Sequence, residues 1–117
     1  MNLKNDHAHW YVQDLEESIS FFKLVGFEFL EYTEHGGKAC MMQSSDGWML
    51  EVQEVGMIQN PGLNHLAFTV DDLDGMCKDL ESKGYKVDGP MDIKLTGRIL
   101  AMVRDPNGIF WQFVQAE

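Results

Sequence analysis

The two halves of the chain share one order of apolar and polar residues. Residues 7–12 are rich in aromatic and β-branched side chains, which is typical of a strand, and residues 65–70 repeat this pattern 58 positions later. A turn signal, Asn60-Pro61-Gly62, lies between the halves. We therefore predict one domain made of two similar modules, residues 3–56 and 63–117.

A helix is predicted after the first strand of each module. Asp14 can cap the first helix, and Leu15, Ile19 and Phe22 lie on one helical face that can pack against a sheet. In the second module, Asp72 is placed to cap the equivalent helix. The chain thus offers one amphipathic helix for each half.

Three further strands are predicted in each module, which gives both modules the order β-α-β-β-β and the chain an α+β fold. Turns such as His35-Gly36-Gly37 and Asp105-Pro106-Asn107-Gly108 separate the strands, and a longer loop is expected around residues 89–96. We place the strands near residues 27–32, 38–44, 48–54, 85–88, 98–104 and 109–115.

Alternation along the strands separates an apolar side, which is expected to pack on the helices, from a polar side. The core is expected to include the three tryptophans, Trp10, Trp48 and Trp111. The polar side carries four residues at repeat-equivalent positions, namely His7, Glu51, His65 and Gln112. Because burying unpaired polar groups is costly, this recurrence calls for a functional explanation.

Two imidazoles, one carboxylate and one amide oxygen are a plausible ligand set for Ni, Zn, Mn or Fe. With a single carboxylate, such a site keeps net positive charge and can act as a Lewis acid on a bound oxygen. His9, Tyr11 and Gln53 lie on the same sides of their strands as His7 and Glu51, so we predict that they line the substrate pocket. The alternative is that the histidines are hydrogen-bonded core or surface residues and that Glu51 faces water.

The composition of the chain disfavours several classes of binding partner. Among the 117 residues, 19 are Asp or Glu and 9 are Lys or Arg, which gives a formal charge of −10 and disfavours nucleic acid and anionic membranes. No apolar run approaches the length of a membrane span, and the N-terminus lacks the pattern of a signal peptide. Cys40 and Cys77 show no metal or disulfide spacing, so we expect reduced thiols and a cytoplasmic protein.

The duplicated β-α-β-β-β order resembles the vicinal oxygen chelate superfamily. This group includes glyoxalase I, extradiol dioxygenases, methylmalonyl-CoA epimerase, and fosfomycin-resistance and bleomycin-binding proteins. The matching motifs, Asp6-His7, Val12–Ser18, Asn64–Leu73 and Asp105-Pro106-Asn107-Gly108, extend over nearly the whole chain. The resemblance implies one glyoxalase-like domain over residues 1–117, with a cupped mixed β-sheet, helices on its outer face and assembly into a homodimer.

Carried over from metal-dependent members, the ligands are His7, Glu51, His65 and Gln112. Gln112 replaces a glutamate that can act as the base in glyoxalases, which leaves Glu51 as the only carboxylate of the set and the candidate catalytic residue. Tyr11 stands where those enzymes often place an arginine for the glutathione carboxylate. The only arginines are Arg98 and Arg104, and an acidic chain is a poor host for anionic thiol conjugates.

The resemblance therefore implies a divalent-metal lyase or isomerase acting on a small substrate that chelates the ion through two neighbouring oxygens. With Fe(II), the same donors could support an extradiol-type dioxygenase. The other alternative is a metal-free protein of the bleomycin-resistance type that sequesters a cationic small molecule, because a negative cleft with aromatic walls suits such a ligand.

Overall fold

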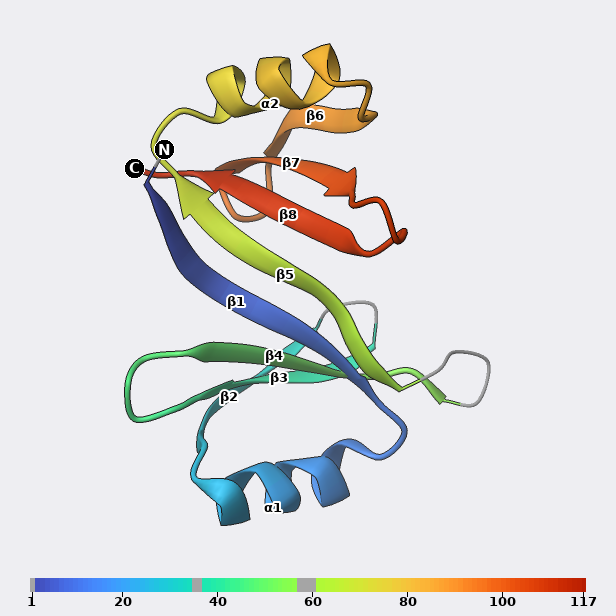
Figure 1. Cartoon of the computed structure of the whole chain (residues 1–117). Helices are drawn as coiled ribbons and strands as arrows, with labels where there is room; N and C mark the ends of the chain where they lie inside the picture. Colours follow the sequence, from blue (N-terminus) through green and yellow to red (C-terminus); the bar gives the residue numbers. More distant parts are fainter. Residues whose placement is uncertain (1, 35–36, 57–60) are drawn as a thin grey trace. The chain divides into compact units, whose positions relative to one another are not determined.

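The computed structural model describes residues 2–34, 37–56 and 61–117 (Figure 1). It confirms the α+β class, with two helices and eight strands of a mixed, open sheet, and it confirms the β-α-β-β-β order of both halves. The elements are β1 (Leu3–Val12), α1 (Leu15–Val25), β2 (Glu28–Glu34), β3 (Lys38–Gln43), β4 (Met49–Glu54), β5 (Gly62–Val70), α2 (Leu73–Ser82), β6 (Val87–Ile93), β7 (Arg98–Arg104) and β8 (Phe110–Gln115).

The chain divides by its contacts into two compact units. One unit holds residues 7–64, and the other holds residues 65–117 together with the first six residues. The predicted turn at His35-Gly36 and Asn60, the first residue of the turn signal Asn60-Pro61-Gly62, lie outside the described residues. In the part of the chain that is described, neither helix has the length and apolar character needed to cross a membrane.

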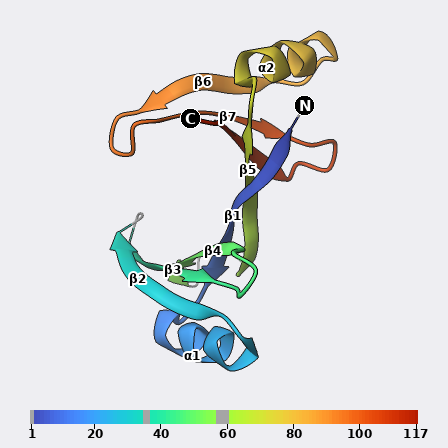
Figure 2. The same cartoon turned by 90° about the vertical axis from the view of Figure 1, so that its left-hand side faces the viewer.

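In the unit of residues 7–64, the strands are hydrogen-bonded in the order β2-β3-β4-β1. β1 runs parallel to β4, and the other neighbours are antiparallel. Helix α1 lies on one side of this sheet, where it contacts mainly β2 and β4 (Figure 2). Leu15 and Ile19 of the helix and Met42, Leu50 and Val52 of the sheet are buried and form the core of the unit.

In the second unit the order is β5-β8-β7-β6, with β5 parallel to β8. Helix α2 contacts β6, β7 and β8, and the core contains Val70, Leu73, Cys77 and Ala101. The start of β1 joins this unit through an ion pair, in which Nη1 of Arg98 donates to Oδ2 of Asp6 at 3.0 Å.

Both helices begin at the predicted caps. Oδ1 of Asp14 accepts a hydrogen bond from the backbone N–H of Glu17 at 2.9 Å, and Oδ1 of Asp72 accepts one from Gly75 at 3.0 Å. Each side chain thereby satisfies one of the N–H groups that have no partner inside the first helical turn.

A second contact, which was not predicted, also holds each helix start. Oε2 of Glu54 accepts from the N–H of Leu15, and Oε1 of Gln115 accepts from the N–H of Leu73, both at 2.9 Å. Glu54 and Gln115 end the fourth strand of their modules, 61 residues apart. The same contact is therefore made twice, between the last strand of a module and the beginning of its helix.

Replacing Glu54 with alanine should lower the free energy of unfolding by about 1–2 kcal/mol, because the first N–H of α1 loses its acceptor. Gln115→Ala should act in the same direction through α2. Urea unfolding followed by circular dichroism measures both changes. Glu54→Gln keeps an acceptor oxygen and should retain most of the stability, whereas an unchanged unfolding midpoint for Glu54→Ala would contradict this role.

Both cysteines are buried free thiols, with exposed fractions of 0% for Cys40 and 3% for Cys77. Burial raises the pKa of Cys40 to about 11. Because the thiolate is the reactive form, we expect a disulfide reagent at about pH 8 to label these thiols only as fast as the protein opens. Labelling with and without urea measures this, and prompt labelling of the native protein would contradict the placement of the thiols.

Three strands differ clearly from their predicted limits. β1 begins already at Leu3 and β5 at Gly62, and β6 covers Val87–Ile93 instead of residues 85–88, so much of the predicted loop is a strand. Gly89-Pro90 predicts a loop, but these residues lie inside β6, where the pairing of β6 with β7 shifts its register between Asp88 and Met91.

The tryptophans are less buried than predicted. Trp10 is 36% exposed and Trp48 is 38% exposed, while Trp111 is partly buried and donates from Nε1 to Oδ2 of Asp105 at 3.1 Å. The reason lies in the position of α1, which packs mainly on β2 and β4 and leaves Trp10 of β1 partly uncovered. Smaller aliphatic side chains fill the space beneath the helix instead.

Candidate active site

The polar face of the 7–64 unit brings four predicted site residues together. In the parallel register of β1 and β4, His9 is paired with Glu51 and Tyr11 with Gln53. The residues that alternate with them, such as Leu50, are buried in the core beneath α1. These four side chains therefore share the face of the sheet that is turned away from the helix.

His9 lies at the centre of this cluster, and only 3% of its surface is exposed. Its Nε2 is hydrogen-bonded to Oε1 of Gln53 at 2.8 Å, and its Nδ1 lies 3.8 Å from Oε1 of Glu51. The ring of Tyr11 meets the imidazole edge-on, with the ring centroids 5.3 Å apart. The imidazole is thus held from two sides, with Nδ1 directed towards the carboxylate.

This arrangement is suited to moving a proton. At 3.8 Å, the imidazole of His9 and the carboxylate of Glu51 are too far apart for a strong direct hydrogen bond, but each can stabilise the opposite charge on the other. An oxygen acceptor at Gln53 favours the tautomer with its proton on Nε2. A substrate group or water that contacts both Glu51 and His9 could then exchange a proton with either one.

β3 supplies the neighbouring part of the same face, which was not predicted in this form. Met41 is paired with Glu51, and Ala39 is paired with Gln53. Met41 is half-buried, whereas Met42 on the other face is fully buried in the core. A flexible thioether therefore borders the polar cluster and can adapt to the shape of a ligand.

The predicted metal ligands are divided equally between the two units. His7 lies two residues before His9 on the same face of β1, and it shares the 7–64 unit with Glu51. His65 and Gln112 belong to the other unit. His65 is buried, with an exposed fraction of 6%, and Gln112 is half-buried.

The second unit does not repeat the imidazole–carboxylate pair. In the register of β5 and β8, Gln112 is opposite Ala67, which occupies the place that His9 has opposite Glu51 in the first unit. Ala67 is fully buried. Only the unit of residues 7–64 therefore combines a basic and an acidic side chain at this position.

Within residues 2–34, 37–56 and 61–117, no group of three or more His, Cys, Asp or Glu side chains is arranged to hold a metal ion. The predicted donor set contains the amide of Gln112 and takes two residues from each unit. By their chemistry, two imidazoles, a carboxylate and an amide oxygen fit a divalent ion such as Ni, Zn, Mn or Fe.

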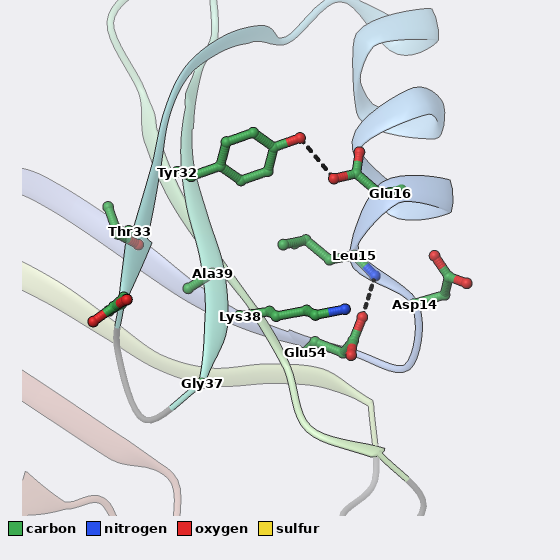
Figure 3. Close-up of a pocket in the computed structure, with 10 residues that line it drawn as sticks. Asp14, Leu15, Glu16, Tyr32, Thr33, Gly37, Lys38, Ala39 and Glu54 are labelled. Atoms are coloured by element: carbon green, nitrogen blue, oxygen red, sulfur yellow. Dashed lines mark hydrogen bonds between the residues drawn. The ribbon is translucent and has the colours of Figure 1, made fainter.

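A cavity of about 1000 Å³ lies beside the start of α1 (Figure 3). Tyr32 points towards Glu16 there and donates from its hydroxyl to Oε1 at 2.6 Å, and this hydrogen bond raises the pKa of Tyr32. Asp14 and Glu54 line the same cavity but accept hydrogen bonds from the helix start. None of the predicted site residues lines it, so the polar face remains the candidate site.

Sequence comparison places the chain in a known family. The family model of the Glyoxalase/Bleomycin resistance protein/Dioxygenase superfamily matches residues 4–113. The chain belongs to this superfamily. The match confirms the family resemblance inferred from the repeated motifs, and no curated protein sequence matches the chain.

Solved structures with the fold of this superfamily member cover nearly its full length. A hypothetical protein, BH1468 from Bacillus halodurans C-125, has a TM-score of 0.79 at 15% identity and covers 100% of this chain and 96% of its own. Methylmalonyl-CoA epimerase from Mycobacterium tuberculosis has a TM-score of 0.75 at 19% identity, with 97% and 88% covered. A variant of the Streptomyces coelicolor epimerase, in complex with 2-nitronate-propionyl-CoA, has a TM-score of 0.71 at 23% identity, with 98% and 99% covered. These similarities show a shared fold.

Proposed function

We propose that this superfamily member is a divalent-metal enzyme of the glyoxalase type, an isomerase or lyase that moves a proton on a carbon next to a carbonyl. Its substrate is a small molecule that chelates the ion through two neighbouring oxygens. The observation that carries the proposal is the pairing of His9 and Glu51 on the polar face of the 7–64 unit, with Gln53 fixing the imidazole.

In this proposal His7, Glu51, His65 and Gln112 hold the ion. A bound divalent ion would polarise the carbonyl oxygen of the substrate and make the adjacent C–H more acidic. A set with one carboxylate leaves net positive charge at the ion, which suits that role.

Glu51 is the group that takes the proton, since it is the only carboxylate of the set. His9 is a positioning and relay residue, because its Nδ1 is directed at Glu51 and its ring is held by Gln53. Tyr11 packs against the imidazole and walls the site on that side. The buried setting of His9 strengthens these electrostatic interactions relative to bulk water.

The similar solved structures favour an isomerase over a ring-opening dioxygenase. Several of the similar solved structures are methylmalonyl-CoA epimerases, one of them in complex with methylmalonyl-CoA and NH4+. The pair of His9 and Glu51 on the polar face also suits proton transfer.

The test uses protein purified without chelator and loaded in turn with Ni²⁺, Zn²⁺, Mn²⁺ or Fe²⁺. Metal analysis and thermal melting report ion binding, since an ion that binds the native state raises the melting temperature. Proton NMR in D₂O then follows deuterium entry into methylmalonyl-CoA and into the hemithioacetal of methylglyoxal. Ion-dependent exchange in either compound supports the proposal. If no ion is bound and the melting temperature does not change with any ion, the proposal is wrong.

A second candidate is the metal-free binding protein, which a groove of about 520 Å³ in the 7–64 unit favours. Aromatic residues line this groove and two carboxylates, Asp14 and Glu17, stand with them, which suits a cationic planar ligand. The aromatic residues are Trp10, Tyr11, Phe21 and Phe22. Tryptophan fluorescence titrated with a basic glycopeptide at rising salt tests this candidate, and no affinity at low salt would exclude it.

A further inference from the structure

Arg104 is a guanidinium that the proposed function leaves unused. The other arginine of the chain, Arg98, is bound to Asp6. Arg104 is exposed and makes no ion pair with any residue that the structure describes; its Nη1 donates to the backbone oxygen of Gly108 at 2.7 Å. Its Cζ lies 3.7 Å from the ring centroid of Phe110. The planar group is therefore held in place while most of its donors remain available.

The strand register places Arg104 on the face that carries the predicted ligands of the second unit. Arg104 of β7 is opposite Phe110 of β8, and Phe110 is in turn opposite His65 of β5. Phe110 and Gln112 alternate onto the same face, away from the core residue Ala101 beneath α2. The guanidinium thus lies over the ring of Phe110, whose strand β8 is the direct neighbour of the strand that carries His65.

The negative charge of the chain is also unequally shared. Residues 7–64 contain nine acidic side chains and two lysines, whereas the unit with Arg104 contains ten acidic and seven basic side chains. An anion therefore meets less repulsion at Arg104 than the net charge suggests.

We propose that Arg104 is a specificity-determining residue that binds a carboxylate of the substrate. The inference rests on the proposed function, because the other end of the substrate meets the ion through two neighbouring oxygens. A substrate held beside His65 can extend such a carboxylate across the neighbouring strand to the guanidinium over Phe110. The substrate is then a chelating carbonyl compound with a second, anionic end.

Two probes that differ only in that end test the proposal. 2-Oxoglutarate and 2-oxopentanoate present the same 2-oxo acid to an ion, but only 2-oxoglutarate carries a distal carboxylate. With Zn²⁺-loaded protein we expect 2-oxoglutarate to bind about tenfold more tightly, as a charge-assisted contact predicts. The Nε–H region of a ¹⁵N NMR spectrum contains two arginines, so the Arg104 signal should move while the Arg98 signal serves as an internal control.

Variants separate this contact from a general effect of charge. Arg104→Gln should lose the preference and keep the affinity for 2-oxopentanoate, and Arg104→Lys should keep part of the preference. Lys94→Gln removes an equal charge elsewhere in the same unit and should change neither affinity; melting curves of all variants verify the fold. An undiminished preference in Arg104→Gln, or an unmoved Arg104 signal, would overturn the proposal.

The same titrations keep the two proposals apart, because Zn²⁺ binding is measured first without any 2-oxo acid. A protein that binds Zn²⁺ but does not distinguish the probes contradicts the role of Arg104 alone. A protein that binds no Zn²⁺, but whose Arg104 signal still moves with 2-oxoglutarate, contradicts the proposed function and supports the carboxylate site. Failure of both measurements overturns both.

Discussion

Glu51→Gln should slow ion-dependent deuterium exchange by about 10²–10⁴-fold, because it removes the general base. The amide retains an oxygen at the position of the carboxylate, as Gln112 does in the second module, so an ion can still be bound. Exchange is measured by proton NMR in D₂O at saturating ion, with the substrate that the wild type accepts.

Glu31→Gln is the matched control for this change. Glu31 is paired with Met41 across β2 and β3, so it is a carboxylate of the same sheet, but it is exposed and belongs to neither the ligand set nor the His9 cluster. Its replacement should leave the exchange rate unchanged. Exchange at the wild-type rate in Glu51→Gln would remove Glu51 from the mechanism, even if the ion still binds.

His7→Ala and His65→Ala should each weaken ion binding by at least about 100-fold, since loss of a direct ligand exceeds the effect of outer contacts. Isothermal titration with Zn²⁺ and Ni²⁺ measures the dissociation constants. Equal losses in the two variants are expected because the histidines occupy equivalent positions of the repeat. Ion binding at wild-type strength in both variants would contradict the assigned ligand set.

His9→Ala is the decisive comparison for these ligands. His9, and not His7, is the residue directly opposite Glu51 in the β1–β4 register. If the ligands are assigned correctly, His9→Ala keeps more of the ion affinity than His7→Ala and loses mainly the exchange rate. A greater loss of ion affinity in His9→Ala would make His9 the ligand and would leave His7 outside the site.

The sequence was informative wherever a local rule decides the structure. Asp14 and Asp72 mark the helix starts by capping, and strand alternation puts His9, Glu51 and Gln53 on one face. Contacts between distant segments could not be predicted. Strand register is set by packing across the sheet, so the pairing of His9 with Glu51 and its hydrogen bond to Gln53 required coordinates.

Burial was predicted less well than secondary structure. Large aromatic residues are usually placed in a core, yet Trp10 and Trp48 remain more than a third exposed. Trp10 lies on β1, whereas α1 packs mainly on β2 and β4. Gly89-Pro90 led to the prediction of a loop where the structure has a strand. Such residues normally interrupt strands, but here β6 accommodates them by a change of register.

The hydrogen bonds from Leu15 to Glu54 and from Leu73 to Gln115 have a further consequence. Each one joins the start of a helix to the last strand of the same module, so the contact that holds each helix start comes from its own half. Copies of this chain that exchanged halves would therefore keep both contacts intact. Duplication of a gene for one such module would have preserved this contact in both copies, with no new contact needed to hold either helix.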